Sequence, residues 1–238
     1  MSGTSNVNQL ANKLLRALPD SEYQRLVPYL ELVSLAPGQV IHNSFEPILD
    51  VYFPEQGLIS LVLLLVRGSN TEVALVGNEG MIGISAFLGG KISISQAITQ
   101  VETTAWKLPA TVLKSEFYQS QALRKVLLLY TQAFLTYISQ IAICNSQHTT
   151  EKRFARCLLS IQDRLKIDGF ALTQKLIASM LGVNRSSVAI AASTLQQAGI
   201  IQSRRGKITI IDREALESVA CECYHSITSE FSRLLDIK

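Results

Sequence analysis

The sequence predicts an α+β protein made of three successive parts. Short β-rich runs separated by turn residues fill positions 33 to 108, which is typical of a β-barrel or jelly roll. An uninterrupted helical period follows at 122–148, and a helix, a glycine turn, a second helix and two short β-rich runs occupy 173–211. We therefore expect a helical lead and barrel over 1–121, a long dimerisation helix over 122–149 and a winged helix-turn-helix over 150–238.

Composition and charge place the chain among well-buried globular proteins. Hydrophobic residues make up 47% and charged residues 17% of its 238 positions. The net charge of +3 is unevenly placed, because 151–211 holds ten Lys and Arg residues against three acids, a net +7. Such a segment favours a polyanion such as DNA. The longest apolar run, Leu58–Val66, has only strand length and the N-terminus lacks a signal-peptide core, so we expect a cytoplasmic protein with no membrane contact.

The N-terminal part changes from a helical to a β pattern at Val33. Residues 6–32 have helical spacing with a break at Pro19-Asp20. The β-rich runs that follow are Gln39–His42, Leu58–Val66, Thr71–Val76, Ile92–Ser95 and Trp106–Leu108. Turn residues separate them at 37–38, 54–57, 67–70, 77–80 and 89–90. This spacing predicts the barrel, and the helical period returns after Pro109.

The long helix has two apolar faces. The first alternates steps of four and three, as in a coiled coil, and consists of Leu123, Leu127, Tyr130, Phe134, Tyr137, Ile141, Cys144 and His148. The second consists of Val126, Leu129, Ala133, Ile138 and Ala142 and can cover the barrel. Because a helix with two apolar faces needs two partners, we predict that the first face joins two copies in a homodimer. Burial of the whole helix within one chain is the alternative.

The most specific pattern lies between 173 and 200. Thr173 can cap a first helix, Gly182 supplies a turn with positive φ, and Ser186 or Ser187 opens a second helix. Ala178 is small enough for the helices to cross closely, and Val188 fills the gap between them. This spacing predicts a helix-turn-helix.

A basic hairpin follows the second helix. The runs Ile200–Ser203 and Lys207–Ile211 flank Arg204-Arg205-Gly206, which predicts a wing with a positive tip. A helix-turn-helix with a basic wing is a DNA-binding layout, and we expect Arg204, Arg205 and Lys207 to contact phosphates. The further candidate DNA contacts are Thr173, Gln174, Asn184, Arg185, Ser186, Ser187 and Ile190.

The tail and the cysteines complete the pattern. Residues 213–235 predict a third helical stretch that closes the C-terminal domain, and four cysteines without framework spacing indicate a reducing compartment. Cys144 and Cys157 are expected to be buried small hydrophobes. In 221–225, Cys221 and His225 share a helix face while Cys223 points away, so we expect no metal and no cofactor there.

This order of parts resembles the cyclic-AMP receptor protein/Fnr (Crp/Fnr) family of bacterial transcription regulators. The resemblance is strongest over 172–211 and at Pro37-Gly38-Gln39-Val40-Ile41, which is similar to the family's first barrel strands. It implies a homodimer whose two recognition helices enter successive major grooves of a near-palindromic double-stranded DNA site. It also implies an effector sensed in the barrel; a small-molecule effector and RNA polymerase are left open as further partners.

The effector positions depart from the family pattern. The resemblance implies a Gly-Glu pair for the ribose hydroxyl and an Arg for the cyclic phosphate. The matching positions are Gly80-Met81 and Ser95-Gln96, and no Arg occurs between Arg67 and Arg124. The iron–sulfur branch has cysteines near the N-terminus, whereas the first cysteine here is Cys144. We therefore predict a regulator whose effector is not a cyclic nucleotide; a cyclic-nucleotide-responsive regulator with an atypical pocket and a cysteine-based redox sensor are the alternatives.

The recognition helix departs from the family as well. The positions that match the Arg, Glu and Arg with which the cyclic-AMP receptor protein reads its site are Arg185, Ser186 and Ile190, so the target sequence cannot be transferred. Arg185 can still hold a guanine through two hydrogen bonds. Three scattered histidines provide neither a nucleophile–base pair nor a metal cluster, so an enzyme is not expected.

Overall fold

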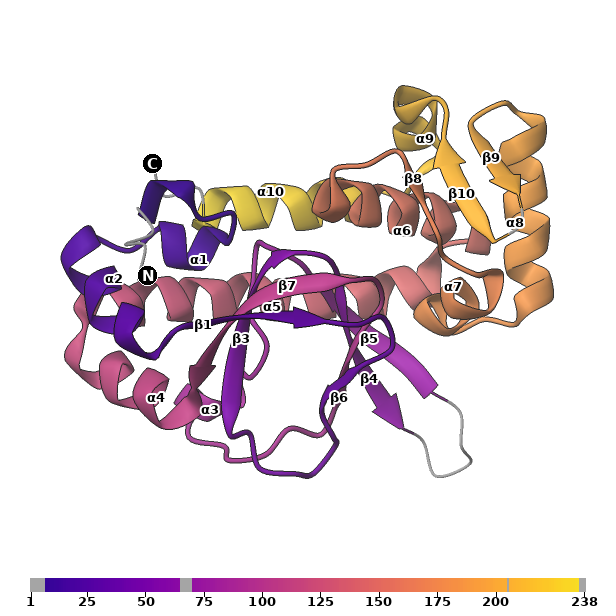
Figure 1. Cartoon of the computed structure of the whole chain (residues 1–238). Helices are drawn as coiled ribbons and strands as arrows, with labels where there is room; N and C mark the ends of the chain where they lie inside the picture. The colour runs from indigo at the N-terminus through magenta and orange to yellow at the C-terminus, as the bar shows by residue number, and fades with distance from the viewer. Residues whose placement is uncertain (1–6, 65–69, 205, 236–238) are drawn as a thin grey trace.

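The computed structural model of the chain describes residues 7–64, 70–204 and 206–235 (Figure 1). A helical lead comes first. Asn12 caps its helix α1 by accepting hydrogen bonds from the N–H groups of Leu14 and Leu15. The Asn12 amide also donates to the carbonyls of Pro54 and Gly80, each at 2.9 Å, so the lead is attached to the barrel. The elements of the lead are η1 (Val7–Gln9), α1 (Lys13–Arg16), α2 (Asp20–Leu26) and η2 (Val27–Tyr29).

Two antiparallel sheets face each other and form the predicted jelly roll. One has the order β1-β7-β3 and the other β2-β6-β4-β5. Ile59, Ile82 and Ala97 are completely buried in one apolar cluster of this part. The strands are β1 (Glu31–Leu35), β2 (Val40–His42), β3 (Asp50–Gln56), β4 (Ile59–Leu64), β5 (Asn70–Val76), β6 (Gln96–Thr99) and β7 (Thr103–Pro109).

Two local predictions in this part are wrong. The run 92–95 is not a strand: Ile92 forms only an isolated bridge to Pro47, the Ser95 N–H bonds to the Ser93 hydroxyl, and β6 begins at Gln96. The predicted turn at 54–57 lies largely within β3, which tolerates a proline because it is an edge strand with a register shift. The predicted turn residues 67–69, and the end of the run Leu58–Val66, lie outside the described residues.

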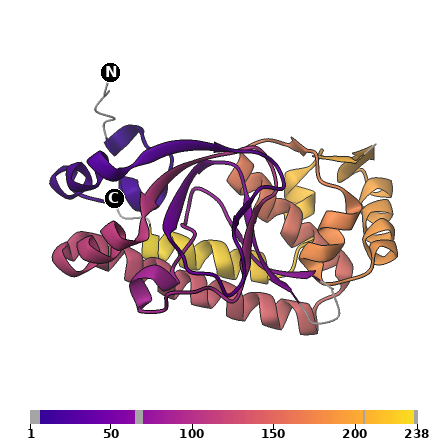
Figure 2. The ribbon, with the colours of Figure 1, turned by 60° about the horizontal axis from the view of Figure 1, so that its bottom comes forward.

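The long helix α5 (Gln121–Gln147) follows α3 (Ser85–Leu88) and α4 (Ala110–Gln119). Its start is capped by the Ser120 side chain, and its bounds agree with the predicted helix to within a residue or two. Within the described residues it is the one helix that is long and apolar enough to cross a membrane, by length and composition alone. No unbroken apolar run marks this helix in the sequence, because polar residues interrupt the apolar ones. Here it packs along the barrel and the C-terminal helix (Figure 2).

The face of α5 that the sequence assigned to the dimer lies against the chain's own core. Five side chains on this face expose 3% or less of their surface, namely Leu123, Leu127, Tyr130, Tyr137 and Cys144. Because the chain itself covers them, they have no surface left to contact a second subunit. Phe134, Ile141 and His148 are half-buried. This burial corrects the predicted seam for the five buried members.

Apolar side chains one position further along α5 remain exposed. Leu128 and Leu135 are seven residues apart and expose 47% and 62% of their surface. Ala142, seven residues after Leu135, is also exposed. The coiled-coil spacing therefore exists in this helix, but the face that is free to use it is rotated by one residue.

The C-terminal helix α10 (Cys223–Leu235) does not close the C-terminal domain as predicted. It turns away after α9 (Arg213–Val219) and runs back along α5 (Figures 1 and 2). Its Phe231 ring lies 6.5 Å from the ring of Tyr130 and 6.3 Å from that of Tyr137. Because Ile227 and Phe231 are four residues apart, they form one apolar stripe that packs on α5.

The remaining segment forms a compact unit around α6 (Thr150–Leu165). Phe154, Leu158 and Leu159 of this helix are completely buried in its core. A small sheet with the order β8-β10-β9 lies beside two further helices. These elements are β8 (Gly169–Phe170), α7 (Gln174–Leu181), α8 (Arg185–Gln197), β9 (Ile201–Arg204) and β10 (Lys207–Ile210).

Candidate nucleic-acid interface

The turn between α7 and α8 is built by backbone caps. Thr173 caps α7 by accepting from the Leu176 N–H at 3.2 Å. Gly182 ends the helix at φ 61°, and the next N–H, of Val183, bonds back to the carbonyl of Ala178 at 3.0 Å. Asn184 then caps α8 by accepting from the Ser187 N–H at 2.8 Å, so α8 begins at Arg185 rather than at a serine. The two helices meet at 107°, the geometry of a helix-turn-helix.

Packing at this crossing decides which face of α8 points outward. Ala178 is 6% exposed and Val188 is completely buried, as the predicted close crossing requires. Ala191 and Leu195 continue the inner face. Ile190 lies on the other side, with 69% of its surface exposed. The outer face of the helix and its cap consists of Asn184, Arg185, Ser186, Ile190, Ser193 and Thr194.

The hairpin of β9 and β10 forms the predicted wing beside α8. Arg204 pairs with Lys207 across the two strands, and both residues are exposed. Arg205 lies outside the described residues. A groove of about 350 Å³ joins the wing to both helices, so that these elements form one continuous surface. It is lined by Leu172, Thr173, Gln174, Arg185, Ser203, Gly206 and Ile208.

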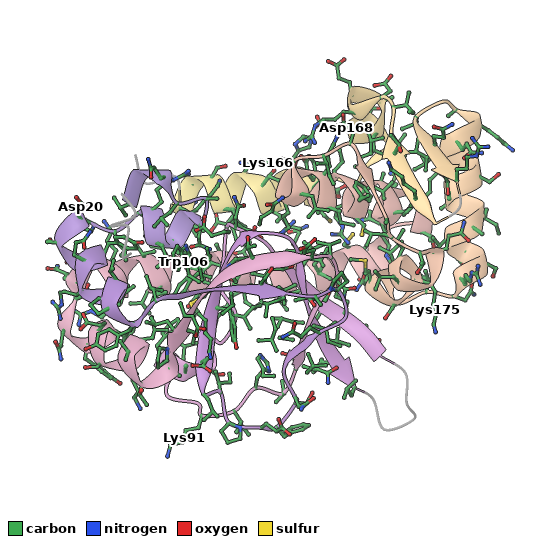
Figure 3. All side chains as sticks on the ribbon, in the orientation of Figure 1. Asp20, Lys91, Trp106, Lys166, Asp168 and Lys175 are labelled. Carbon is green, nitrogen blue, oxygen red and sulfur yellow. The ribbon has the colours of Figure 1, made fainter. Side chains whose placement is uncertain are left out.

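Part of the positive charge of 151–211 does not reach this surface. Arg153 and Arg156 are 7% and 5% exposed, and Arg164 pairs with Glu79 at 2.8 Å. The sequence predicted that the whole net charge of 151–211 serves DNA binding, and the burial of these three arginines corrects that assignment. Lys175 projects outward from α7 (Figure 3). The exposed basic residues of α7, α8 and the wing are Lys175, Arg185, Arg204 and Lys207.

Gly80 and Met81, the first pair of expected effector positions, are covered by the long helix. The Tyr130 hydroxyl donates to the Met81 carbonyl at 3.2 Å, and the Met81 side chain is 1% exposed. A Cβ on Gly80 would lie 2.4 Å from the Tyr130 hydroxyl oxygen, so glycine is needed for this close contact. The pair therefore anchors α5 to the barrel.

Ser95 and Gln96, the second pair, bond to neighbouring side chains. The Ser95 hydroxyl lies 3.0 Å from that of Ser93, and the Gln96 amide donates to the Asn43 side-chain oxygen at 2.8 Å. Lys91, the basic residue nearest to this pair in the sequence, is exposed and projects away from the barrel (Figure 3). The residues that follow the two pairs, Ile82 and Ala97, share one apolar cluster.

A buried carboxyl group lies on β5, and the sequence reasoning missed it. Glu72 is 8% exposed and is hydrogen-bonded by the hydroxyl of Ser60. Burial raises the pKa of Glu72 to about 8, although Arg156 and Arg164 oppose this change. The sequence did not show that Glu72 is buried, because Thr71 and Glu72 fit the alternating pattern of a half-exposed strand.

Three of the four cysteines come together with a histidine. Cys144, Cys221 and Cys223 are 2% exposed or less, and their sulfur atoms cluster with a ring nitrogen of His148. The expectation that Cys223 points away is wrong, because α10 begins at Cys223 and Cys221 lies before the helix. The sequence did contain a signal for this cluster, because Cys144 and His148 are four residues apart on one helix and Cys221 and Cys223 form a Cys-x-Cys pair. Cys157 is buried elsewhere, and burial raises its pKa to about 12.

Tyr224, Asp163 and the start of α9 form a separate polar region. The Tyr224 hydroxyl donates to Asp163 at 2.8 Å and accepts from Arg213 at 2.7 Å. Arg213 also pairs with Asp163 and Glu217, each at 2.9 Å. These bonds attach α9 and α10 to α6. His225 is outside the cysteine cluster.

Comparison with known proteins identifies both halves of the chain. Residues 152–219 match the Crp-like helix-turn-helix domain, and residues 32–120 match the cyclic nucleotide-binding domain. The comparison with curated protein sequences gives no match.

Solved structures with the same architecture come from several bacteria. FixK2 from Bradyrhizobium japonicum is 21% identical with a TM-score of 0.71, covering 81% of this chain and 98% of its own. A CRP-family transcriptional regulator from Thermus thermophilus is 22% identical with a TM-score of 0.66, covering 79% and 96%. At these identities the likeness shows the fold.

Proposed function

Because the chain belongs to the Crp/Fnr family of transcription regulators and carries its helix-turn-helix domain, we propose that it acts as a homodimer on a specific DNA site. The observation that carries this proposal is the outer face of α8, which presents Arg185, Ser186 and Ile190 beside an exposed basic wing. An α-helix fits the major groove, and a helix-turn-helix presents the N-terminal residues of its second helix to base edges. We propose further that it works in the cytoplasm, with RNA polymerase as an additional partner.

Base contacts are assigned to the start of α8. Arg185 can donate two hydrogen bonds to a guanine, and the exposed Ile190 suits contact with a thymine methyl group. Asn184 is engaged in capping, because its side-chain oxygen accepts from Ser186 and Ser187, at 2.7 to 2.9 Å. We therefore assign Asn184, Ser186 and Ser187 chiefly to holding the helix start in place.

Phosphate contacts are assigned to the wing and to the start of α7. Arg204, Arg205 and Lys207 would contact the phosphates on one side of the DNA groove that α8 enters. Thr173 and Gln174 would contact the phosphates on the other side. The groove that joins these elements also borders Arg185, so one DNA duplex can touch the wing and α8 together. Lys175 on the same side adds a further positive charge.

The dimer contact is assigned to the exposed face of α5. Leu128, Leu135 and Ala142 repeat every seven residues, and the half-buried Ile138 lies between them. Two copies packed about a twofold axis along this face would place the two α8 helices on one side of the dimer. We propose the domain division 1–121, 122–149 and 150–238, with α10 as a strap from the third part back to the second.

The effector is proposed not to be a cyclic nucleotide. A cyclic phosphate carries a full negative charge, and burying it without a cation costs several kcal/mol. The pair Gly80-Met81 is covered by Tyr130, and Ser95 provides one neutral hydroxyl. The identity of any effector is left open.

Selection from random double-stranded DNA tests the proposed function. We expect an enriched near-palindrome whose half-sites are separated by about one helical turn, roughly 34–36 Å, or a multiple of it. Arg204→Ala should weaken binding to all sequences alike and flatten the salt dependence, whereas the exposed Lys91→Ala, far from the wing, should change neither. Recovery of unenriched DNA, or of a single half-site, would contradict the proposal.

A further inference from the structure

Four donor atoms converge where α5 ends and α10 begins. The sulfur atoms of Cys144, Cys221 and Cys223 and one ring nitrogen of His148 all lie within 4.8 Å of one another. The Cys144 and Cys221 sulfurs are 3.5 Å apart, and the Cys223 sulfur is 3.5 Å from Nδ1 of His148. All three cysteines are free thiols.

These separations fit a tetrahedral metal site. Zinc bonds to sulfur at about 2.3 Å and to histidine nitrogen at about 2.0–2.1 Å, which puts the donors of a tetrahedron about 3.5–3.8 Å apart. Thiolate ligands select soft or borderline metals over Mg²⁺ and Ca²⁺. We propose that Cys144, His148, Cys221 and Cys223 form a closed Cys₃His site for Zn²⁺.

The surroundings of the histidine support this assignment. Nδ1 of His148 faces Cys223, while Nε2 lies 3.2 Å from a carboxylate oxygen of Glu222. A metal-bound histidine usually donates its second N–H to a carboxylate, which fixes the tautomer and the ring orientation. Glu222 lies between two of the proposed ligands in the sequence and is well placed for that role.

The other neighbours suit a site with a negative charge. Three thiolates and one Zn²⁺ carry a net charge of −1. The guanidinium group of Arg156 is buried and interacts electrostatically with Cys144. The Gln140 amide donates to Cys223 at 3.2 Å. A buried cation and a polar donor compensate the sulfur ligands in a site from which water is excluded.

The position of the site indicates what the metal would do. Cys144 and His148 belong to the last turn of α5 and its cap, whereas Cys221 and Cys223 lie where the chain leaves the winged helix-turn-helix. Arg153, the neighbour of this cluster on α6, donates to the carbonyl of Leu181 at the end of α7. Bound Zn²⁺ would therefore fix the helix-turn-helix unit to the long helix, whatever DNA the unit binds.

Metal binding by the full-length protein tests the site without any assay of DNA. The reduced protein, stripped with a chelator, should bind one Zn²⁺ per chain, and Co²⁺ should give the visible bands of a tetrahedral thiolate complex. Hydrogen exchange at 144–149 and 219–224 should slow when Zn²⁺ is added. Cys144→Ser should weaken Zn²⁺ binding at least 100-fold, while Cys157→Ser, a matched change of a buried cysteine outside the site, should retain it.

A second pair of variants keeps the test valid if Cys144→Ser does not fold. Glu222→Gln changes an exposed side chain and should weaken Zn²⁺ binding about 10- to 100-fold. Glu214→Gln, on the exposed surface of α9, should leave it unchanged. Failure of the reduced protein to bind Zn²⁺ stoichiometrically, or equal losses in Cys157→Ser, would overturn the proposal. So would a Cys144–Cys221 disulfide that persists in the reducing buffer.

Discussion

Placing a charge on the exposed face of α5 should separate the two subunits of the proposed homodimer. Leu135 keeps 62% of its surface exposed in the single chain, the largest share among the large apolar residues of this helix. Full burial of a leucine is worth about 1.5–3 kcal/mol, so burying the exposed part contributes about 1–2 kcal/mol per subunit. A symmetric contact contains two copies, and Leu135→Asp should therefore cost about 2–4 kcal/mol before carboxylate desolvation is added.

A loss of this size raises the dimer dissociation constant by about 30- to 1,000-fold. Sedimentation equilibrium over a range of protein concentrations measures that constant. Leu32→Asp is the matched control, because Leu32 is 56% exposed on β1, on the side of the barrel opposite to α5 (Figure 2). A Leu135→Asp protein that dimerises like the wild type would refute the assignment of this face, and a Leu32→Asp protein that dissociates would move the interface to the barrel.

Two further outcomes follow from single side chains and a third from the effector positions of the barrel. Burial raises the pKa of Glu72 from 4.5 to about 8, so the native state holds a proton that the unfolded state releases, and the free energy of unfolding falls as pH rises through that window. Glu72→Gln should remove this fall and stabilise the protein by up to about 5 kcal/mol at pH 9 but little at pH 5, and parallel urea-unfolding profiles of the two proteins would contradict it. Tyr137→Phe deletes the hydroxyl that accepts from the Leu75 N–H at 3.1 Å and should cost about 1–3 kcal/mol in urea unfolding, because a buried donor is left unpaired; an unchanged midpoint would be inconsistent with that bond. Titration calorimetry with cyclic AMP and cyclic GMP should detect no binding, and micromolar affinity for either would mean that another residue replaces the missing arginine.

The helix-turn-helix was predictable because its signal is local. Thr173, Ala178, Gly182 and Val188 are each fixed by the geometry of two crossing helices, and the structure uses all four as expected. The helix start was misplaced by one or two residues because Asn184 and the serines after it can all serve as caps.

The long helix and the tail could not be resolved in the same way. Periodicity shows that α5 has several apolar faces but does not show which of them the chain covers itself. The answer depends on α10, whose Phe231 returns to pack against Tyr130 and Tyr137 from almost 100 residues away in the sequence. The cysteine cluster was missed for the same reason, because a helical wheel drawn through Cys221 assumed a helix that begins two residues later.

The central claim is that α8 reads bases while the wing holds phosphates, and one binding measurement tests it directly. Fluorescence anisotropy is recorded for the wild type, Arg185→Ala and Lys207→Ala on the selected DNA and on single-base variants of it, over a range of salt concentrations. Arg185→Ala should lose about 1–3 kcal/mol on the selected site and lose discrimination at one base pair, whereas Lys207→Ala should weaken all sequences alike and reduce the salt slope by about one. An Arg185→Ala protein that keeps both its affinity and its discrimination would show that α8 is not the helix that reads the DNA.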